Sequence, residues 1–305
     1  WLLMLVVSNY SVGQTVPVGT PVLDDYLRRA QLLGDIDSAS SFMIRPLYPV
    51  SAFGIKYGFD LDSSVVDMDA TTVHKFFGKD NKGKFLMLPA VAKFQYNSTY
   101  AFGVNDGAFI PNRGIQAILS PGAYLEYGPF SLQFQPELLM AQNQDYDGFP
   151  IEHQATILFY YDYMNRIDMP ERFGEDSYTS AYLGQSSIRY NFKEYSLGIS
   201  SENLWWGPGR RSSLLLGNNA PGFIHFTANT RKPVHTGIGS FEGQMIGGFL
   251  KSSGFLPPWP DYRIQENNVY IPKPTNSKHT SLSGFQVFFL VMALLARCTA
   301  EMYLL

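Results

Sequence analysis

The sequence predicts an all-β protein, an antiparallel outer-membrane β-barrel that is incomplete in this chain and carries a short N-terminal helical periplasmic segment. Three observations favour this fold class. Aromatic residues make up 15% of the 305 residues and charged residues only 16%, below the roughly 25% of ordinary soluble domains. Apolar and polar residues alternate along several segments. Short and long connections alternate between those segments.

Composition excludes several other classes of protein. A hydrophobic share of 45% is too high for a disordered chain. The formal net charge is −3 and the basic residues are scattered, so the basic face that nucleic-acid binding needs is missing. Cys298 is the only cysteine, so neither an internal disulfide nor a cysteine-based zinc site can form. No apolar run reaches the ~18 residues of a spanning helix.

The N-terminal residues have the character of an export signal. Trp1 to Val7 form a short apolar run, followed by small and polar residues. We assign residues 1–14 to the remnant of a signal peptide, with cleavage near Gly13 or Gln14. The alternative is a buried N-terminal strand.

Residues 20–33 predict a helix within an N-terminal periplasmic segment that we assign to 15–83. Thr20 suits the N-cap, Pro21 the first helical position and Gly34 the C-terminal stop. An apolar stripe along one side predicts that this helix packs against another surface.

Strict alternation follows the polar stretch 79–84 and marks a partial barrel that we assign to 84–287. Gly128-Pro129 and Lys193-Glu194 predict minimal hairpin turns, whereas the connections at the other rim are long. Sorting of loops by side is typical of outer-membrane barrels, with periplasmic turns and extracellular loops, and not of a soluble sandwich. The predicted strands are 91–97, 113–127, 130–140, 187–193, 195–202, 223–231 and 238–249, with a last candidate near Ser281; the long connections are 98–112, 141–184, 203–222 and 250–280.

The polar face of these strands becomes the lumen of the barrel. Opposite charges in a partly dry interior should pair. One interpretation is that the charges fill and stiffen the lumen, and the other is that they line a ligand path. The predicted charge network consists of Glu137, Arg189, Glu202, Arg231 and Glu242.

The densest motif is ENLWWGPGRRSSLLLGNNAPG at 202–222. Its tryptophans can stack on sugar rings, its arginines can bind the carboxylates of acidic sugars, and its amides can bind hydroxyls. The alternative is that the Gly-Pro-Gly turn and the tryptophan pair serve loop packing or an interfacial girdle. The candidate polysaccharide-binding residues are Asn203, Trp205, Trp206, Arg210, Arg211, Asn218 and Asn219.

This motif resembles the capsule assembly protein Wzi family, bacterial outer-membrane proteins that hold capsular polysaccharide at the cell surface. The resemblance implies a closed barrel of about eighteen strands, N-terminal helices on the periplasmic side and a lectin-like, non-enzymatic role. The expected partners are capsular polysaccharide and outer-membrane lipid, with no nucleic acid, no metal, no cofactor and a monomeric state. Supporting stretches lie at 94–129, 165–174, 184–192 and 231–244.

The C-terminal end departs from the family pattern. Alternation collapses after Val287, and about eight or nine strands are too few for a closed family barrel, so we assign 288–305 to an aberrant or truncated tail. No catalytic group is predicted, since His225 shares the polar face with Thr227 and Asn229 rather than with a nucleophile. Two alternative functions stay open, an outer-membrane porin or solute channel and a soluble β-sandwich adhesin.

Overall fold

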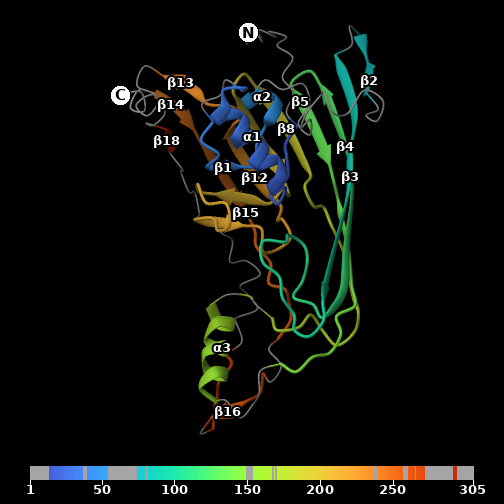
Figure 1. The fold of residues 1–305 in the computed structure, drawn as a ribbon, viewed down its shortest axis with the longest axis vertical. Helices are drawn as coiled ribbons and strands as arrows, with labels where there is room; N and C mark the ends of the chain where they lie inside the picture. Colours follow the sequence, from blue (N-terminus) through green and yellow to red (C-terminus); the bar gives the residue numbers. More distant parts are fainter. Residues whose placement is uncertain are drawn as a thin grey trace, which may run out of the picture.

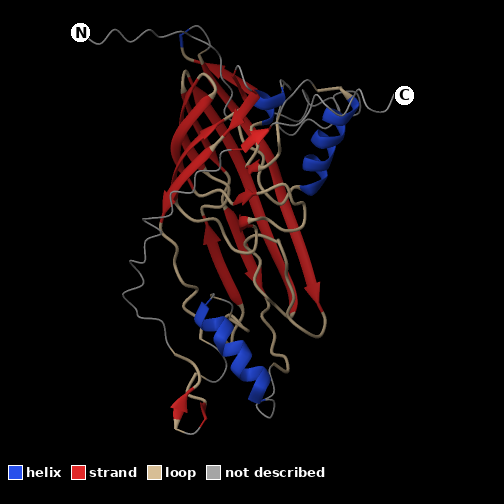
Figure 2. Ribbon diagram, turned by 90° about the vertical axis from the view of Figure 1, so that its left-hand side faces the viewer, coloured by secondary structure: helices blue, strands red, loops and turns tan. Residues whose placement is uncertain are grey.

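The protein is built on one large antiparallel sheet. A computed structural model describes residues 14–36, 40–53, 74–79, 82–148, 154–166, 168, 170–236, 239–256, 260–264, 266–271 and 291–293. Its strands run side by side along the long axis of the molecule, with helices at both ends (Figures 1 and 2). The strand order is β15-β12-β9-β8-β5-β4-β3-β2, and β15 and β2 are open edges in the described part. The prediction of an incomplete antiparallel barrel is confirmed.

Two of the long strands are interrupted. β5 and β6 both pair with β4, and they are followed around the sheet by β8 and β7 respectively. β5 and β6 therefore lie end to end as one interrupted strand beside β4, and β8 and β7 lie end to end as the next one. The bounds are β2 (His74–Phe77), β3 (Gly83–Asn97), β4 (Gly114–Tyr127), β5 (Phe130–Phe134), β6 (Glu137–Ala141), β7 (Tyr178–Tyr182), β8 (Ser187–Phe192), β9 (Tyr195–Ser200), β12 (His225–Thr230) and β15 (Gln244–Gly248).

Both predicted hairpin turns are confirmed. Tyr127 and Phe130 are paired across Gly128-Pro129, and Phe192 and Tyr195 are paired across Lys193-Glu194. Gly128 and Lys193 have positive φ values of 57° and 50°, the left-handed conformation that tight hairpins require. These turns lie at the same end of the sheet, because Phe130 also pairs with Tyr190 of β8.

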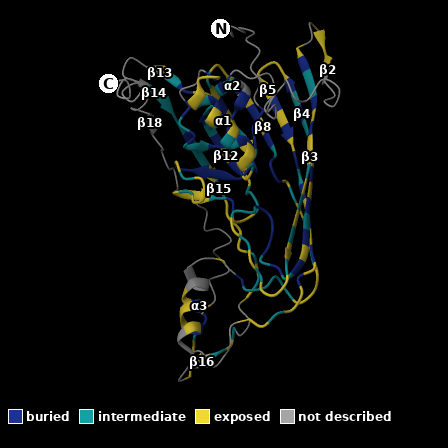
Figure 3. Cartoon of the chain, viewed as in Figure 1, coloured by how far each residue is buried: buried dark blue, intermediate teal, exposed yellow. Residues whose placement is uncertain are grey.

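Burial along the strands is inverted relative to a soluble protein. On β5, Phe130 and Phe134 are 58% and 49% exposed, whereas Ser131 and Gln133 are 4% and 2% exposed. Figure 3 shows this alternation of exposed and buried positions along the sheet. A sheet with an apolar outer face and a polar inner face is what a barrel in lipid requires. β8 and β9 repeat the pattern, with Ile188, Tyr190, Phe192, Tyr195, Leu197 and Ile199 exposed and Ser187, Arg189, Asn191, Ser196 and Ser200 buried.

The predicted N-terminal helix is confirmed as α1 (Pro21–Leu33). Thr20 precedes it, and Gly34 ends it in the left-handed conformation with φ 80°. The packed part of the apolar stripe is narrower than predicted, since Val22 and Leu33 are exposed. The buried side covers the following segment, which contains β1 (Ile44–Arg45) and α2 (Pro49–Phe53). This small apolar core consists of Val16, Leu23, Leu27, Ala30, Ile36, Phe42, Leu47 and Phe53.

A third helix, α3 (Gln154–Arg166), was not predicted. It lies in the long connection after β6, at the opposite end of the molecule from α1 and beside β16 (Arg263–Ile264) (Figure 1). A small aromatic core holds it, formed by Ile157, Tyr160, Tyr161 and Tyr270. Among the described residues, no helix has the length and apolarity needed to cross a membrane.

The predicted strand 238–249 is wrong in detail, because it is two strands separated by Gly243. β14 (Gly239–Glu242) leaves the large sheet and pairs with β13 (Val234–Thr236) and β18 (Val291–Ala293), while β15 stays in it. A glycine suits such a break, since it packs no side chain into the strand. The large sheet also begins with β2, inside the segment assigned to 15–83. The signal residues 1–13 and the start of the predicted strand near Ser281 lie outside the described residues.

The sidedness of the sheet gives a testable prediction. Gln144 follows β6 and is exposed at the end opposite the Lys193 turn, which is also exposed. In a Cys298→Ser background, we expect an impermeant thiol reagent to label Gln144→Cys on intact cells and to spare Lys193→Cys. Both variants should react once the cells are lysed. Labelling of position 193 alone on intact cells would show that the orientation in the membrane is the reverse of the predicted one.

Candidate functional site

The motif of residues 203–222 folds inward against the N-terminal segment. Its first strand, β10 (Leu204–Trp206), pairs with β1 on one side and with β11 (Leu215–Gly217) on the other. Trp205 and Trp206 are 3% and 1% exposed. The motif therefore forms a small sheet of its own inside the curved large sheet, rather than a free loop at the rim.

Both indole N–H groups bind within the protein. Trp205 Nε1 donates to the carbonyl oxygen of Gly209 over 3.0 Å, and Trp206 Nε1 donates to Gln244 Oε1 over 2.7 Å. The Arg45 guanidinium lies over the Trp205 ring, 5.5 Å from its centroid, and donates from Nη2 to Gly209 O over 3.1 Å. The tryptophans therefore fix the Gly-Pro-Gly turn and attach the motif to β15 and β1.

The three candidate asparagines connect separate parts of the chain. Gln185 Nε2 donates to Asn203 Oδ1 over 2.9 Å, and the Asn203 N–H donates to Gln185 Oε1 over 3.1 Å. Asn218 Nδ2 donates to Asn105 O over 2.9 Å, and the Asn105 N–H donates to Asn219 Oδ1 over 2.7 Å. The two long connections 98–112 and 203–222 are thus joined to each other by hydrogen bonds.

Arg210 and Arg211 are the exposed charged residues of the candidate set, and Asn219 is exposed as well. The Arg210 side chain is 61% exposed and forms an ion pair with Asp25 of α1. Arg211 is also exposed, and its carbonyl oxygen accepts a hydrogen bond from Asn105 Nδ2 over 2.6 Å. Their guanidinium groups stand apart from the polar contacts that the rest of the motif makes.

A cavity of about 880 Å³ lies between these arginines and α1. Asp24 and Arg45 form an ion pair on its wall, with 3.3 Å between Oδ2 and Nη1. Burial lowers the pKa of the Arg45 guanidinium, and Asp24 opposes this effect. Asp24 Oδ1 is buried and accepts no hydrogen bond. The cavity therefore combines charges of both signs; its polar lining includes Asp24, Asp25, Arg45, Asn105, Arg210, Arg211 and Asn218.

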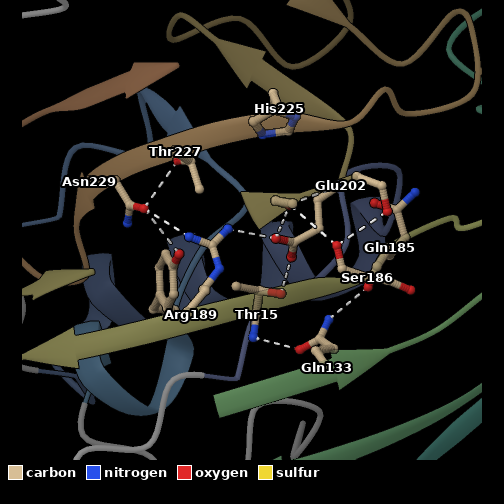
Figure 4. A network of polar contacts seen from close by, with 12 residues as sticks. Thr15, Gln133, Gln185, Ser186, Arg189, Glu202, His225, Thr227 and Asn229 are labelled. Carbon is tan, nitrogen blue, oxygen red and sulfur yellow. Dashed lines mark hydrogen bonds and ion pairs between the residues drawn. The ribbon is translucent and has the colours of Figure 1, made fainter. Parts of the chain in front are cut away.

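A second polar site lies between the motif and the sheet, centred on Glu202 (Figure 4). Arg189 Nη2 lies 2.7 Å from Glu202 Oε2, and these side chains are 1% and 0% exposed. Ser200 Oγ donates to the same oxygen over 2.7 Å, and Thr15 Oγ1 donates to Oε1. Asn229 Oδ1 accepts from Arg189 Nη1 over 3.0 Å. Of the predicted charge network, the structure brings this one oppositely charged pair together.

The other three predicted lumen charges bind elsewhere. Glu137 Oε1 accepts from Gln185 Nε2 over 3.2 Å, so it joins the motif through a neutral side chain. Arg231 donates to Ser51 Oγ over 3.2 Å and to the Lys193 carbonyl oxygen. Glu242 accepts hydrogen bonds from the N–H and hydroxyl of Ser41. Arg231 and Glu242 therefore hold the N-terminal segment and the Lys193 turn, not each other.

The partners that the N-terminal segment supplies are not predicted by the sequence pattern. Thr15 reaches Glu202, and Asp25 reaches Arg210, across more than 180 residues of sequence. No local pattern indicates such pairs. A weaker signal was present in Gln133 and Ser200, which alternate onto the polar face and do contact this network.

The described residues hold no group of three or more His, Cys, Asp or Glu side chains placed to bind a metal ion.

Two further titratable side chains form local contacts. His225 Nδ1 lies 2.8 Å from the carbonyl oxygen of Phe223, so the backbone holds this histidine. At the end of the sheet opposite the Lys193 turn, burial and the neighbouring Glu171 raise the pKa of Tyr146 to about 12. A hydroxyl with such a pKa is neutral at physiological pH and can act there as a hydrogen-bonding group.

Comparison with protein families identifies one match. The model of the family described as capsule assembly protein Wzi matches residues 105–260, which is 156 of the 305 residues. The matched region contains the whole motif, the Arg189–Glu202 pair and α3. Comparisons with curated proteins and with solved structures found no significant match.

The buried ion pair predicts a large effect on stability. Removing one partner of such a pair leaves an uncompensated charge and costs about 3–5 kcal/mol. We expect Arg189→Met to lower the free energy of unfolding by that amount, measured by urea titration of the folded protein in detergent. Arg189→Met combined with Glu202→Gln should recover part of the loss, because the unpaired carboxylate is then gone.

Arg211→Ala is the matched control, since Arg211 is exposed and such substitutions change stability by about 0.5 kcal/mol or less. An Arg189→Met variant as stable as this control would show that the pair does not hold the fold.

Proposed function

The chain belongs to the capsule assembly protein Wzi family of outer-membrane proteins, and from this premise we propose that it holds capsular polysaccharide at the cell surface as a lectin-like, non-catalytic protein. The proposed partners are the polysaccharide and the surrounding lipid, and the proposed state is a monomer.

The burial pattern supports the contact with lipid. The outward side chains of β5, β8 and β9 are Phe, Leu, Tyr and Ile, all at least 39% exposed. Exposed apolar surface of this extent is costly in water and is stabilised by hydrocarbon. A soluble β-sandwich would instead bury these side chains against a second layer.

The cavity beside Arg210 and Arg211 carries the proposal of polysaccharide binding. Guanidinium groups bind sugar carboxylates through paired, charge-assisted hydrogen bonds. Of the seven candidate residues, Arg210 and Arg211 have exposed charged heads next to a cavity of 880 Å³, large enough for a few sugar rings. We therefore propose acidic sugars as the bound class, with Trp205 and Trp206 positioning the arginines through the turn at Gly209.

The filled interior supports attachment over solute transport. Residues 107–110 and 203–206 are buried inside the sheet, and Asn105, Asn218 and Asn219 tie their connections together. A porin needs an open, water-filled lumen, and buried segments of this kind would block the passage of solutes.

The arginines give the functional prediction. We expect Arg210→Ala with Arg211→Ala to leave the protein folded and to weaken binding of acidic capsular fragments about 10-fold to 100-fold, since charge-assisted hydrogen bonds contribute about 1.5–3 kcal/mol. Cells should shed capsule, because a polymer contacts many copies of the protein and each contact is weakened. The measurements are fragment affinity of the purified protein and the ratio of cell-bound to shed polysaccharide.

Lys193→Ala is the control, since it removes an exposed cation of the β8–β9 turn, which does not line this cavity. Heat-modifiable gel migration monitors folding in every variant. Trp206→Ala should instead deplete the folded form, because the ring is buried and large-to-small changes there cost about 3–5 kcal/mol. A folded arginine variant that retains capsule like wild type would remove this motif from the binding site.

A further inference from the structure

Gln14 and Thr15 lie in the polar interior of the molecule. Gln14 and Thr15 are 1% and 0% exposed. The Thr15 N–H donates to Gln133 Oε1 over 3.1 Å, and the Val16 N–H donates to the Leu47 carbonyl oxygen over 3.0 Å. Figure 4 shows Thr15 between Gln133 and Glu202. The position of Gln14 is therefore fixed by its neighbours on the sheet and on the N-terminal segment.

The side chain of Gln14 is poorly accommodated as an amide. Its Nε2 group is buried and has no hydrogen-bond acceptor. A buried donor without a partner costs free energy, and native proteins hold few of them. The neighbouring Thr15, by contrast, uses both its N–H and its hydroxyl.

The sequence before Gln14 has the form of a leader cleavage site. Ser11-Val12-Gly13 places small residues at the two positions that a signal peptidase reads, and an apolar run precedes them. Cleavage after Gly13 makes Gln14 the first residue of the exported chain. Its new α-amino group would then be protonated at neutral pH.

A protonated amine at this point needs a counter-charge. The acid that this contact network contains is Glu202, which binds the adjacent Thr15. Glu202 already binds Arg189 and Ser200 through Oε2 and Thr15 through Oε1. Burying a further cation without its own partner is strongly unfavourable. After cleavage, Gln14 would thus carry two unfavourable buried groups, an amide without a hydrogen-bond acceptor and an amine without a counter-charge.

We propose that the exported chain begins at Gln14 and that this residue is cyclised to pyroglutamate. The α-nitrogen attacks the side-chain carbonyl carbon Cδ, a C–N bond forms, and the bond from Cδ to Nε2 breaks. The amide nitrogen leaves as ammonia and takes a proton from the attacking amine, so no other reactant is consumed. The reaction removes the amine charge and the unpartnered amide group together. It precedes insertion, because Gln14 is buried in the folded protein.

The test is the mass of the N-terminal peptide of the full protein, isolated from outer membranes. Tryptic cleavage at Arg28 should give a peptide that starts at residue 14 and is lighter than its sequence by one ammonia. It should also escape an amine-reactive label applied to freshly denatured membranes. An isotope-labelled synthetic peptide with a free Gln14, carried through the same steps, measures cyclisation that arises during handling. A labelled Gln14 amine, or a different first residue, overturns the proposal.

Gln14→Asn is the matched variant, since it keeps an amide but cannot close the five-membered ring. We expect it to retain a free amine and, at the wild-type urea midpoint, to show a ratio of folded to unfolded protein about tenfold lower. Thr20→Ser, a conservative change in the same segment, should behave like wild type. If Gln14→Asn folds with wild-type stability while its amine stays free, burial does not require the ring and the argument fails.

Discussion

The buried pair of Arg189 and Glu202 is the contact on which the rest of the interior depends. Arg189 projects from β8, and Glu202 follows β9 and begins the inward motif. Thr15 brings the N-terminal segment to one oxygen of Glu202, and Asn229 brings β12 to Arg189. Tyr48 adds a further contact, since its ring faces the Arg189 guanidinium at 5.4 Å. Two charges out of water are stable only when other groups bind them, so the pair requires all four parts of the chain; of the Arg189 nitrogens, Nε is buried without a hydrogen-bond partner.

The outward-facing apolar side chains of the sheet explain why a buried polar network is needed. Because the apolar side chains face outward, they cannot form the core that holds a soluble protein together. Cohesion inside the sheet must come from hydrogen bonds among buried polar groups such as Gln133, Gln185 and Asn203. Partly satisfied networks of this kind are costly, which is consistent with long connections and an N-terminal segment folding in to complete them.

Much of the sheet could be predicted from the sequence, because its determinants are local. The two-residue turns at Gly128 and Lys193 and the alternation along β5 and β8 are properties of neighbouring residues, and so is the start and stop of α1. The Gly243 break and the helix α3 were missed. Gly243 interrupts an otherwise regular alternation, and α3 is held by the distant Tyr270 rather than by its own periodicity.

The site was predicted as a set of residues but not as an arrangement. The sequence indicates that Trp205, Trp206 and the asparagines matter, yet it does not distinguish groups that touch a ligand from groups that hold a loop. That distinction depends on partners such as Asn105 and Gln244, which no local pattern connects to the motif. Of the seven candidate residues, the charged ones are Arg210 and Arg211, and both line the cavity with exposed side chains. The most direct test of a filled, polymer-holding interior is conductance of the purified protein in planar bilayers. The account predicts almost no current, and steady open channels would contradict it.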